Sequence, residues 1–133
     1  MGDVPFCWGE GNYGKLGNGS TERKLVPTLV SGGLSFQSVS AGAEHTCGLT
    51  GTGAAYCWGW GDSGQLGQGS TQEELVPSVV SGGLTFESVS AGGYHTCGVT
   101  VDGETYCWGW GPGGVLGNGS AEDKLVPTLV WGG

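Results

Sequence analysis

Histidine and cysteine recur together in this chain, in a pattern that could hold a metal ion or form disulfides. His45 and Cys47 lie two residues apart, and Cys57 follows ten residues later. If these segments form an antiparallel hairpin, the three side chains share one face, as a zinc site would require. A fourth ligand is missing, and Gly59 lies opposite His45. We therefore expect a buried, hydrogen-bonded histidine and no metal.

The cysteine spacing predicts two disulfides and one free thiol. A hairpin centred on residue 52 brings Cys47 opposite Cys57, close enough for a bond. The same arithmetic pairs Cys97 with Cys107. Cys7 is left over as an exposed free thiol that could join two chains. Disulfides favour an extracellular or periplasmic setting, although no signal peptide is visible at the start of the chain.

Other residues that could support catalysis do not form a recognisable pattern. The chain has no Ser/His/Asp ordering and no repeated carboxylate pair, so we expect no enzyme and no cofactor. Residues 9–14, 59–64 and 109–114 each match the G-x-G-x-x-G pattern of dinucleotide sites. That pattern needs a helix directly after its third glycine, and the residues that follow here would not form one. The glycines are therefore interpreted as architectural.

The elements that position these residues repeat every fifty residues. Cys-Trp-Gly occurs at 7–9, 57–59 and 107–109, and Leu-Val-Pro occurs at 25–27, 75–77 and 125–127. Periods of this length, with several short strands per unit, are typical of propeller blades.

Each repeat is predicted to contain four strands. In the middle copy they fall at 36–41, 45–50, 54–60 and around 76–80, with a glycine-rich connection over 61–70. No window has a helical period, so the 31 glycines are interpreted as turn residues of an all-β fold. The invariant Trp8, Trp58 and Trp108 are expected in the core between blades.

The run SVSAGGYHTCGVTVDGETYCWGWGPGGVLGNG at 88–119 resembles the repeat of the regulator of chromosome condensation family. The resemblance extends from Phe6 to Trp131 and implies a seven-bladed β-propeller. The family's eukaryotic founder is an exchange factor for a small GTPase that docks on nucleosomes. The cysteine-bearing repeats look bacterial, and one bacterial relative is a secreted inhibitor that caps β-lactamases with its loops. Function does not transfer within such a family as reliably as fold.

The chain is shorter than a closed seven-bladed ring, which at this period needs roughly 350 residues. We predict a partial β-propeller of about two and a half four-stranded blades. Residues 1–33 form a half blade with the third and fourth strands, and residues 34–83 and 84–133 form complete blades. A fragment or engineered segment of a longer array, without independent function, is one reading of this length.

Positions that differ between the copies are those that the fold does not dictate. They include Lys15, Gln65 and Val115, which are expected to be solvated. Loop residues of this kind are candidates for a binding surface. The candidates are Glu10, Tyr13, Glu44, Trp60, Asp62, Tyr94 and Trp110. They favour a non-catalytic protein-binding scaffold, and the alternative is a carbohydrate-binding propeller that stacks sugars on Trp60 and Trp110.

The net charge and the expected apolar faces limit which classes of partner the chain could bind. The chain has four Lys and Arg residues against twelve Asp and Glu residues, a net charge of −8. We therefore expect neither nucleic acid nor an anionic membrane surface as a partner. An open arc of blades leaves apolar faces at both ends, so we expect self-association into a propeller-like assembly, a homo-oligomer.

Overall fold

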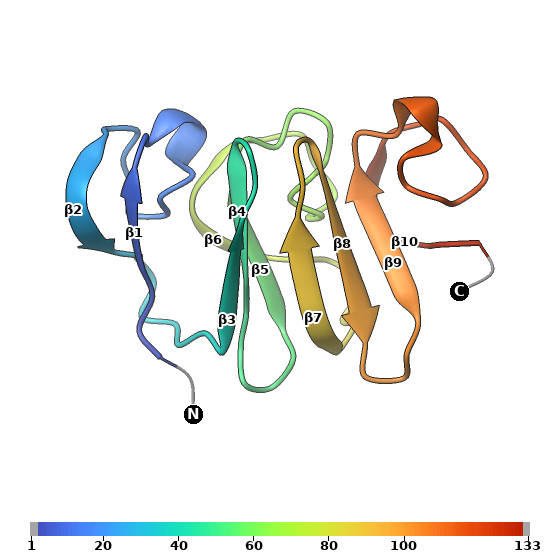
Figure 1. Cartoon of the computed structure of the whole chain (residues 1–133), viewed down its shortest axis with the longest axis horizontal. Coiled ribbons are helices and arrows are strands. Elements are labelled where there is room, and N and C mark those ends of the chain that lie inside the picture. Colours follow the sequence, from blue (N-terminus) through green and yellow to red (C-terminus); the bar gives the residue numbers. More distant parts are fainter. Residues whose placement is uncertain (1–2, 132–133) are drawn as a thin grey trace.

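The computed structural model describes residues 3–131 and shows a row of antiparallel sheets that does not close into a ring (Figure 1). The first sheet has two strands, and the next two have four each. The strands are β1 (Phe6–Gly9), β2 (Lys24–Leu29), β3 (Ser38–Ala41), β4 (His45–Leu49), β5 (Ala55–Gly59), β6 (Glu74–Val79), β7 (Phe86–Ala91), β8 (His95–Thr100), β9 (Thr105–Gly109) and β10 (Lys124–Leu129). The predicted all-β partial propeller is confirmed.

The G-x-G-x-x-G segments contain no α-helix. In the first and third copies a single 3₁₀ turn ends at the third glycine: η1 (Asn12–Gly14) and η2 (Pro112–Gly114). Both turns lie along the upper edge of the molecule in Figure 1, near the ends of β1 and β9. No helix in the described range is long and apolar enough to cross a bilayer.

The hairpin register follows the predicted pairing. In β4 and β5, Cys47 lies opposite Cys57 and His45 lies opposite Gly59. The strands β8 and β9 repeat this register with Cys97 opposite Cys107. The outer strand of the middle sheet begins at Glu74, slightly earlier than expected, because Glu74 pairs with Gly59 across a bulge.

The core lies between neighbouring sheets. Trp58 and Trp108 are both 0% exposed, and they pack against Phe36 and Phe86 at ring-centroid distances of 5.6 and 5.8 Å. The prediction of a buried tryptophan is wrong for Trp8, which is 60% exposed. Trp58 and Trp108 are covered by turns of the preceding sheet, and no described residue occupies the corresponding place beside Trp8.

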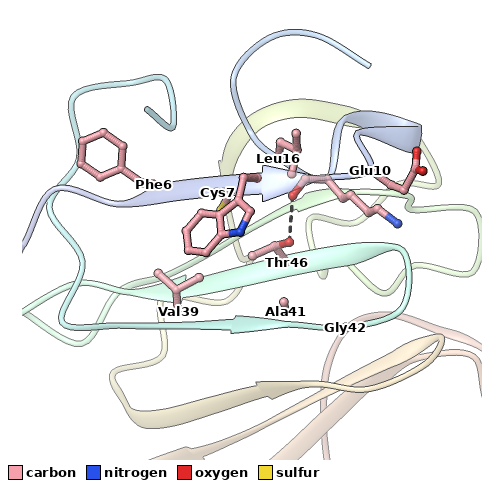
Figure 2. Close-up of a pocket in the computed structure, with 10 residues that line it drawn as sticks. Phe6, Cys7, Glu10, Leu16, Val39, Ala41, Gly42 and Thr46 are labelled. Carbon is pink, nitrogen blue, oxygen red and sulfur yellow. Dashed lines mark hydrogen bonds between the residues drawn. The ribbon is translucent and has the colours of Figure 1, made fainter. Parts of the chain in front are cut away.

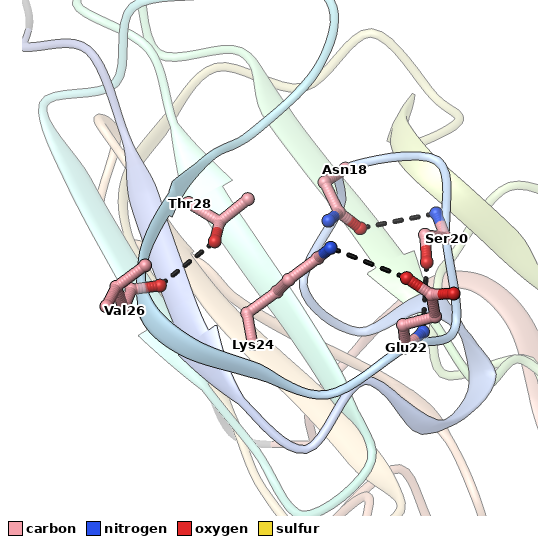
Figure 3. A network of polar contacts seen from close by, with 6 residues as sticks. All are labelled: Asn18, Ser20, Glu22, Lys24, Val26 and Thr28. Atoms are coloured by element: carbon pink, nitrogen blue, oxygen red, sulfur yellow. Dashed lines mark hydrogen bonds and ion pairs between the residues drawn. The ribbon is translucent and has the colours of Figure 1, made fainter.

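The turn that leads into β2 is held by a chain of short-range hydrogen bonds (Figure 3). The Ser20 backbone N–H donates to Asn18 Oδ1 (3.2 Å), and the Glu22 N–H donates to Ser20 Oγ (2.9 Å). Lys24 Nζ then donates to Glu22 Oε1 at 3.5 Å. The third copy repeats the first two bonds. Side chains that bond to nearby backbone groups fix such turns without a helix or sheet.

Candidate functional site

Four aromatic side chains from three sheets lie in one continuous row, which we call the aromatic row: Tyr13, Trp60, Tyr94 and Trp110. Tyr13 stacks on Trp60 with centroids 5.4 Å apart and an interplanar angle of 27°. Trp60 meets Tyr94 edge-on at 5.3 Å, and Tyr94 meets Trp110 edge-on at 6.4 Å. Tyr13, Tyr94 and Trp110 are exposed. Four of the seven residues proposed from the sequence are thus brought together.

Glycines at the strand ends direct the two tryptophans into this row. Gly59 has a φ of +108°, and a Cβ there would lie 2.7 Å from the Glu44 carbonyl oxygen. The chain can therefore leave β5 with the Trp60 N–H donating to the same carbonyl at 3.0 Å. The Trp110 N–H donates to the Tyr94 carbonyl at 2.9 Å in the same way. The invariant glycine positions a side chain that itself varies between copies.

Tyr13 holds its place in the row with a strained backbone. Its φ of +64° is the one positive value at a non-glycine residue among residues 3–131. The corresponding residue of the third copy is Gly113, with a φ of +80°. A non-glycine residue in this region costs about 1–3 kcal/mol, and such strain is concentrated at functional sites. The turn alone would be more stable with glycine, and the stacking of Tyr13 on Trp60 offsets part of that cost.

The three acidic candidates flank the row. Glu44 Oε1 lies 2.8 Å from Lys15 Nζ, and Glu10 lies 3.6 Å from the Arg23 guanidinium. Asp62 has no hydrogen-bonded or ionic side-chain partner in the described part of the chain. The rim therefore presents aromatic rings beside carboxylates, two of which already have cationic partners.

His45 joins two sheets and is held neutral. It is fully buried, and its Nε2 lies 2.8 Å from Thr96 Oγ1, which donates its hydrogen to the Gln65 carbonyl at 2.7 Å. Because that hydroxyl has one hydrogen, Nε2–H must be the donor to Thr96. Burial, with a smaller contribution from the charge of His95, lowers the pKa of His45 to about 4. Residues 3–131 contain no group of His, Cys, Asp or Glu side chains placed to hold a metal ion.

The cysteines fall into two pairs and one separate thiol. Cys47 and Cys57 are at disulfide distance, as are Cys97 and Cys107, with Cα atoms 4.1 Å apart in each pair. Cys7 was expected to be exposed, and that expectation is wrong, since it is half-buried. Burial raises the pKa of its thiol, which makes it less reactive at neutral pH.

Cys7 lines a pocket of about 340 Å³ between the first two sheets (Figure 2). Phe6 and Trp8 contribute from β1, whose only partner among the described strands is β2, and Val39 contributes from β3. Thr46 Oγ1 donates to the Lys15 carbonyl at 2.8 Å across one side of this pocket. Glu10 and Lys15 also line this pocket beside the thiol and the apolar side chains, and their charged groups pair with Arg23 and Glu44.

The expectation that the variable positions are solvated is wrong for Gln65. Gln65 is fully buried because the third sheet covers it, and its Oε1 accepts from the Ser63 N–H at 2.9 Å. Its counterparts Lys15 and Val115 are half-buried and exposed. Variation between copies thus marks contacts between sheets as well as free surface. The invariant glycines around these positions were the signal for that contact.

The sequence matches the family model for the Regulator of chromosome condensation (RCC1) repeat over residues 4–49, 52–99 and 102–132. The chain belongs to the RCC1 repeat family. A second model of this repeat matches residues 36–65 and 86–114.

Similar curated proteins match over short stretches of RCC1 repeats. The chain is 38% identical to the human E3 ubiquitin-protein ligase HERC2 over 56 residues, which is 41% of this chain and 1% of that protein. It is 43% identical to the Ultraviolet-B receptor UVR8 of Arabidopsis thaliana over 51 residues, 37% of this chain and 12% of the receptor. The activities of these whole proteins therefore do not pass to this chain.

Solved structures agree on the fold over nearly the whole chain. Prp20p from Saccharomyces cerevisiae superposes with a TM-score of 0.83 at 25% identity, covering 94% of this chain and 33% of that one. Human WBSCR16 superposes with a TM-score of 0.77 at 23% identity, covering 96% of this chain and 35% of that one. The RCC1 repeat chain thus corresponds to about a third of each of these structures.

Proposed function

We propose that this RCC1 repeat chain is a non-catalytic scaffold that binds a partner protein through the aromatic row. The observation that carries the proposal is the contact of Tyr13, Trp60, Tyr94 and Trp110 along one exposed rim. Tryptophan and tyrosine are enriched among the residues that dominate binding energy at protein interfaces. Strain at Tyr13 and variation between copies support a role outside folding.

Charge supports a partner with a basic contact surface. Each of the four Lys and Arg residues forms an ion pair with a Glu side chain. The remaining acidic residues give the chain its net charge of −8, which steers positively charged partners toward it. Cations also bind favourably over aromatic faces. The structure of yeast Prp20p was reported with its binding to Gsp1p and histones, and a second structure has Kap60 bound to the same protein, so one relative with this fold binds proteins.

The experiment replaces aromatic residues with the residues that another copy has at the same place. Trp60→Glu copies Glu10, Tyr94→Glu copies Glu44, and Tyr13→Gly copies Gly113. These changes should leave the fold intact. Proteins captured by the parent chain from an extract of its source, but not by the triple variant, are identified and their affinity is measured by calorimetry. We expect at least a tenfold loss in affinity, and equal affinity for parent and variant would overturn the proposal.

Carbohydrate binding is the second candidate, because two sheets each place a tryptophan on the rim. Trp60 has Tyr13 stacked on it, whereas the corresponding neighbour of Trp110 is Ser63. The two tryptophans therefore do not form equivalent sugar platforms. A glycan array on which the chain binds sugars, with binding lost in Trp110→Glu, would favour this candidate over protein binding.

We also propose that copies of the chain associate with one another and that the chain works in an oxidising, extracytoplasmic setting. Exposed apolar residues at the outer sheets support the association. The two cysteine pairs at disulfide distance support the setting. A solution mass that rises with concentration would test the first point, and thiol counting in unreduced protein would test the second.

A further inference from the structure

One set of contacts joins the first sheet to the second. A Cβ at Gly17 would lie 2.6 Å from Nε1 of Trp58, so the indole packs directly on the backbone of that turn. Leu75 packs on Gly14 more closely still. The Gly19 N–H donates to the Leu75 carbonyl at 2.9 Å. A tryptophan, a leucine and three glycines therefore make the joint.

The same set joins the second sheet to the third. A Cβ at Gly67 would lie 2.6 Å from Nε1 of Trp108, and one at Gly64 would lie 2.5 Å from Leu125. The Gly69 N–H donates to the Leu125 carbonyl at 2.9 Å. Each residue of this joint follows its counterpart in the first joint by fifty positions in the sequence. The joint is thus a repeated and specific interface.

A third set of these residues is present but divided between the two ends of the molecule. Trp8 is 60% and Leu25 is 85% exposed on the first sheet. On the last sheet a Cβ at Gly114 would meet no atom within 4 Å, and one at Gly117 would meet Val130 of its own sheet. The Gly119 N–H has no backbone acceptor in the described part of the chain. The first sheet therefore has the tryptophan and leucine of a joint, and the last sheet has the three glycines that would receive them.

We propose that a second copy of this chain docks head to tail through these two halves. Trp8 and Leu25 of one copy pack on Gly117 and Gly114 of the next, and the Gly119 N–H donates to the Leu25 carbonyl. This inference rests on the proposed self-association and names its contacts. A second copy is the occupant we infer because this chain has every residue type of the joint, at the matching positions of its repeat.

The end-to-end joint differs from the internal ones in two respects. Trp131 stands where the other copies have Ser31 and Ser81, and its ring lies against Gly119, adding apolar surface at this end. The internal bond from Thr46 Oγ1 to the Lys15 carbonyl has no counterpart in the described first sheet, which lacks the inner strands. The joint is therefore a reversible association, and because its two surfaces differ it extends chains or closes a ring.

The test uses one charged substitution on each surface, both in a Cys7→Ser background that excludes intermolecular disulfides. Leu25→Asp disables the first surface. Val115→Asp disables the second, since it places a carboxylate where one internal joint has the fully buried Gln65 and the other has the cation of Lys15. Val101→Asp, at a similarly exposed valine in the hairpin loop between β8 and β9, is the matched control. Circular dichroism checks that each variant is folded.

Sedimentation velocity at tens of micromolar should show assembly of the parent and the control, and monomers of 13.4 kDa for Leu25→Asp alone and Val115→Asp alone. An equimolar mixture of these two variants should form a species of twice that mass, because each keeps the surface that the other has lost. A monomeric parent would overturn self-association altogether. An assembling parent whose two variants do not complement each other would overturn the head-to-tail joint alone. Neither result bears on binding by the aromatic row.

Discussion

At the scale of single residues, His45 makes stability depend on pH. The folded protein holds its pKa at about 4, while an unfolded chain has the ordinary value near 6.5. Between these values the unfolded state binds more protons, so stability falls as the pH is lowered from 7 toward 4. We expect a loss of about 2 kcal/mol between pH 7 and pH 5, measured by urea unfolding.

The His45 resonance in a proton NMR titration supplies the direct check, with His45→Gln used for assignment. A midpoint near 4 is expected, whereas a midpoint above 6 would contradict the burial argument. The Gln variant should also lose most of the slope of stability against pH that the parent shows over this range.

The sequence predicted the neighbours of individual residues better than their burial. Pairing arithmetic around residue 52 was enough to place Cys47 opposite Cys57 and Gly59 opposite His45, because hairpin register is local. Burial of Gln65 and exposure of Trp8 depend on which sheet packs alongside. The packing partners lie about fifty residues away in the chain, and only the repeated glycines at the contacts indicate where two sheets meet.

At the scale of elements, the hairpins β4–β5 and β8–β9 each bring two cysteines to disulfide distance. Thiol titration of unfolded, unreduced protein should find one free cysteine, Cys7, because the other four are paired. Removing one link with Cys97→Ser and Cys107→Ser should lower stability by about 2–3 kcal/mol at most, since a ten-residue separation closes a short loop. Five reactive thiols would contradict the pairing and the extracytoplasmic setting with it.

The joint between sheets gives a second prediction at this scale. Trp58→Ala removes an indole that is packed on all sides and should cost about 3–5 kcal/mol. Trp8→Ala makes the same chemical change at the equivalent position, where the side chain is 60% exposed, and should cost less than about 1 kcal/mol in dilute protein. Urea unfolding at low micromolar concentration compares the two, and equal losses would mean that Trp8 is covered in solution.

At the scale of the whole molecule, the sequence was sufficient for the architecture and insufficient for the site. The fifty-residue period and the strand pattern predicted the three sheets, because every copy repeats the same pattern of strand and turn residues. The candidate list contained all members of the aromatic row together with the acids. Only the structure shows that Tyr13 of the first copy stacks on Trp60 of the next, since a propeller rim brings together residues from different blades.

The distribution of charge over the molecule predicts that this RCC1 repeat chain does not bind DNA, despite the family's name. Binding to duplex DNA needs cations that replace the counterions of the phosphates. All four cations of this chain already face carboxylates, and the net charge is −8. Fluorescence anisotropy of a labelled duplex should stay constant up to low micromolar protein at physiological salt. A rise in anisotropy that weakens as salt is added would contradict the prediction. Such salt dependence would show that Lys or Arg side chains leave their ion pairs to contact the phosphates.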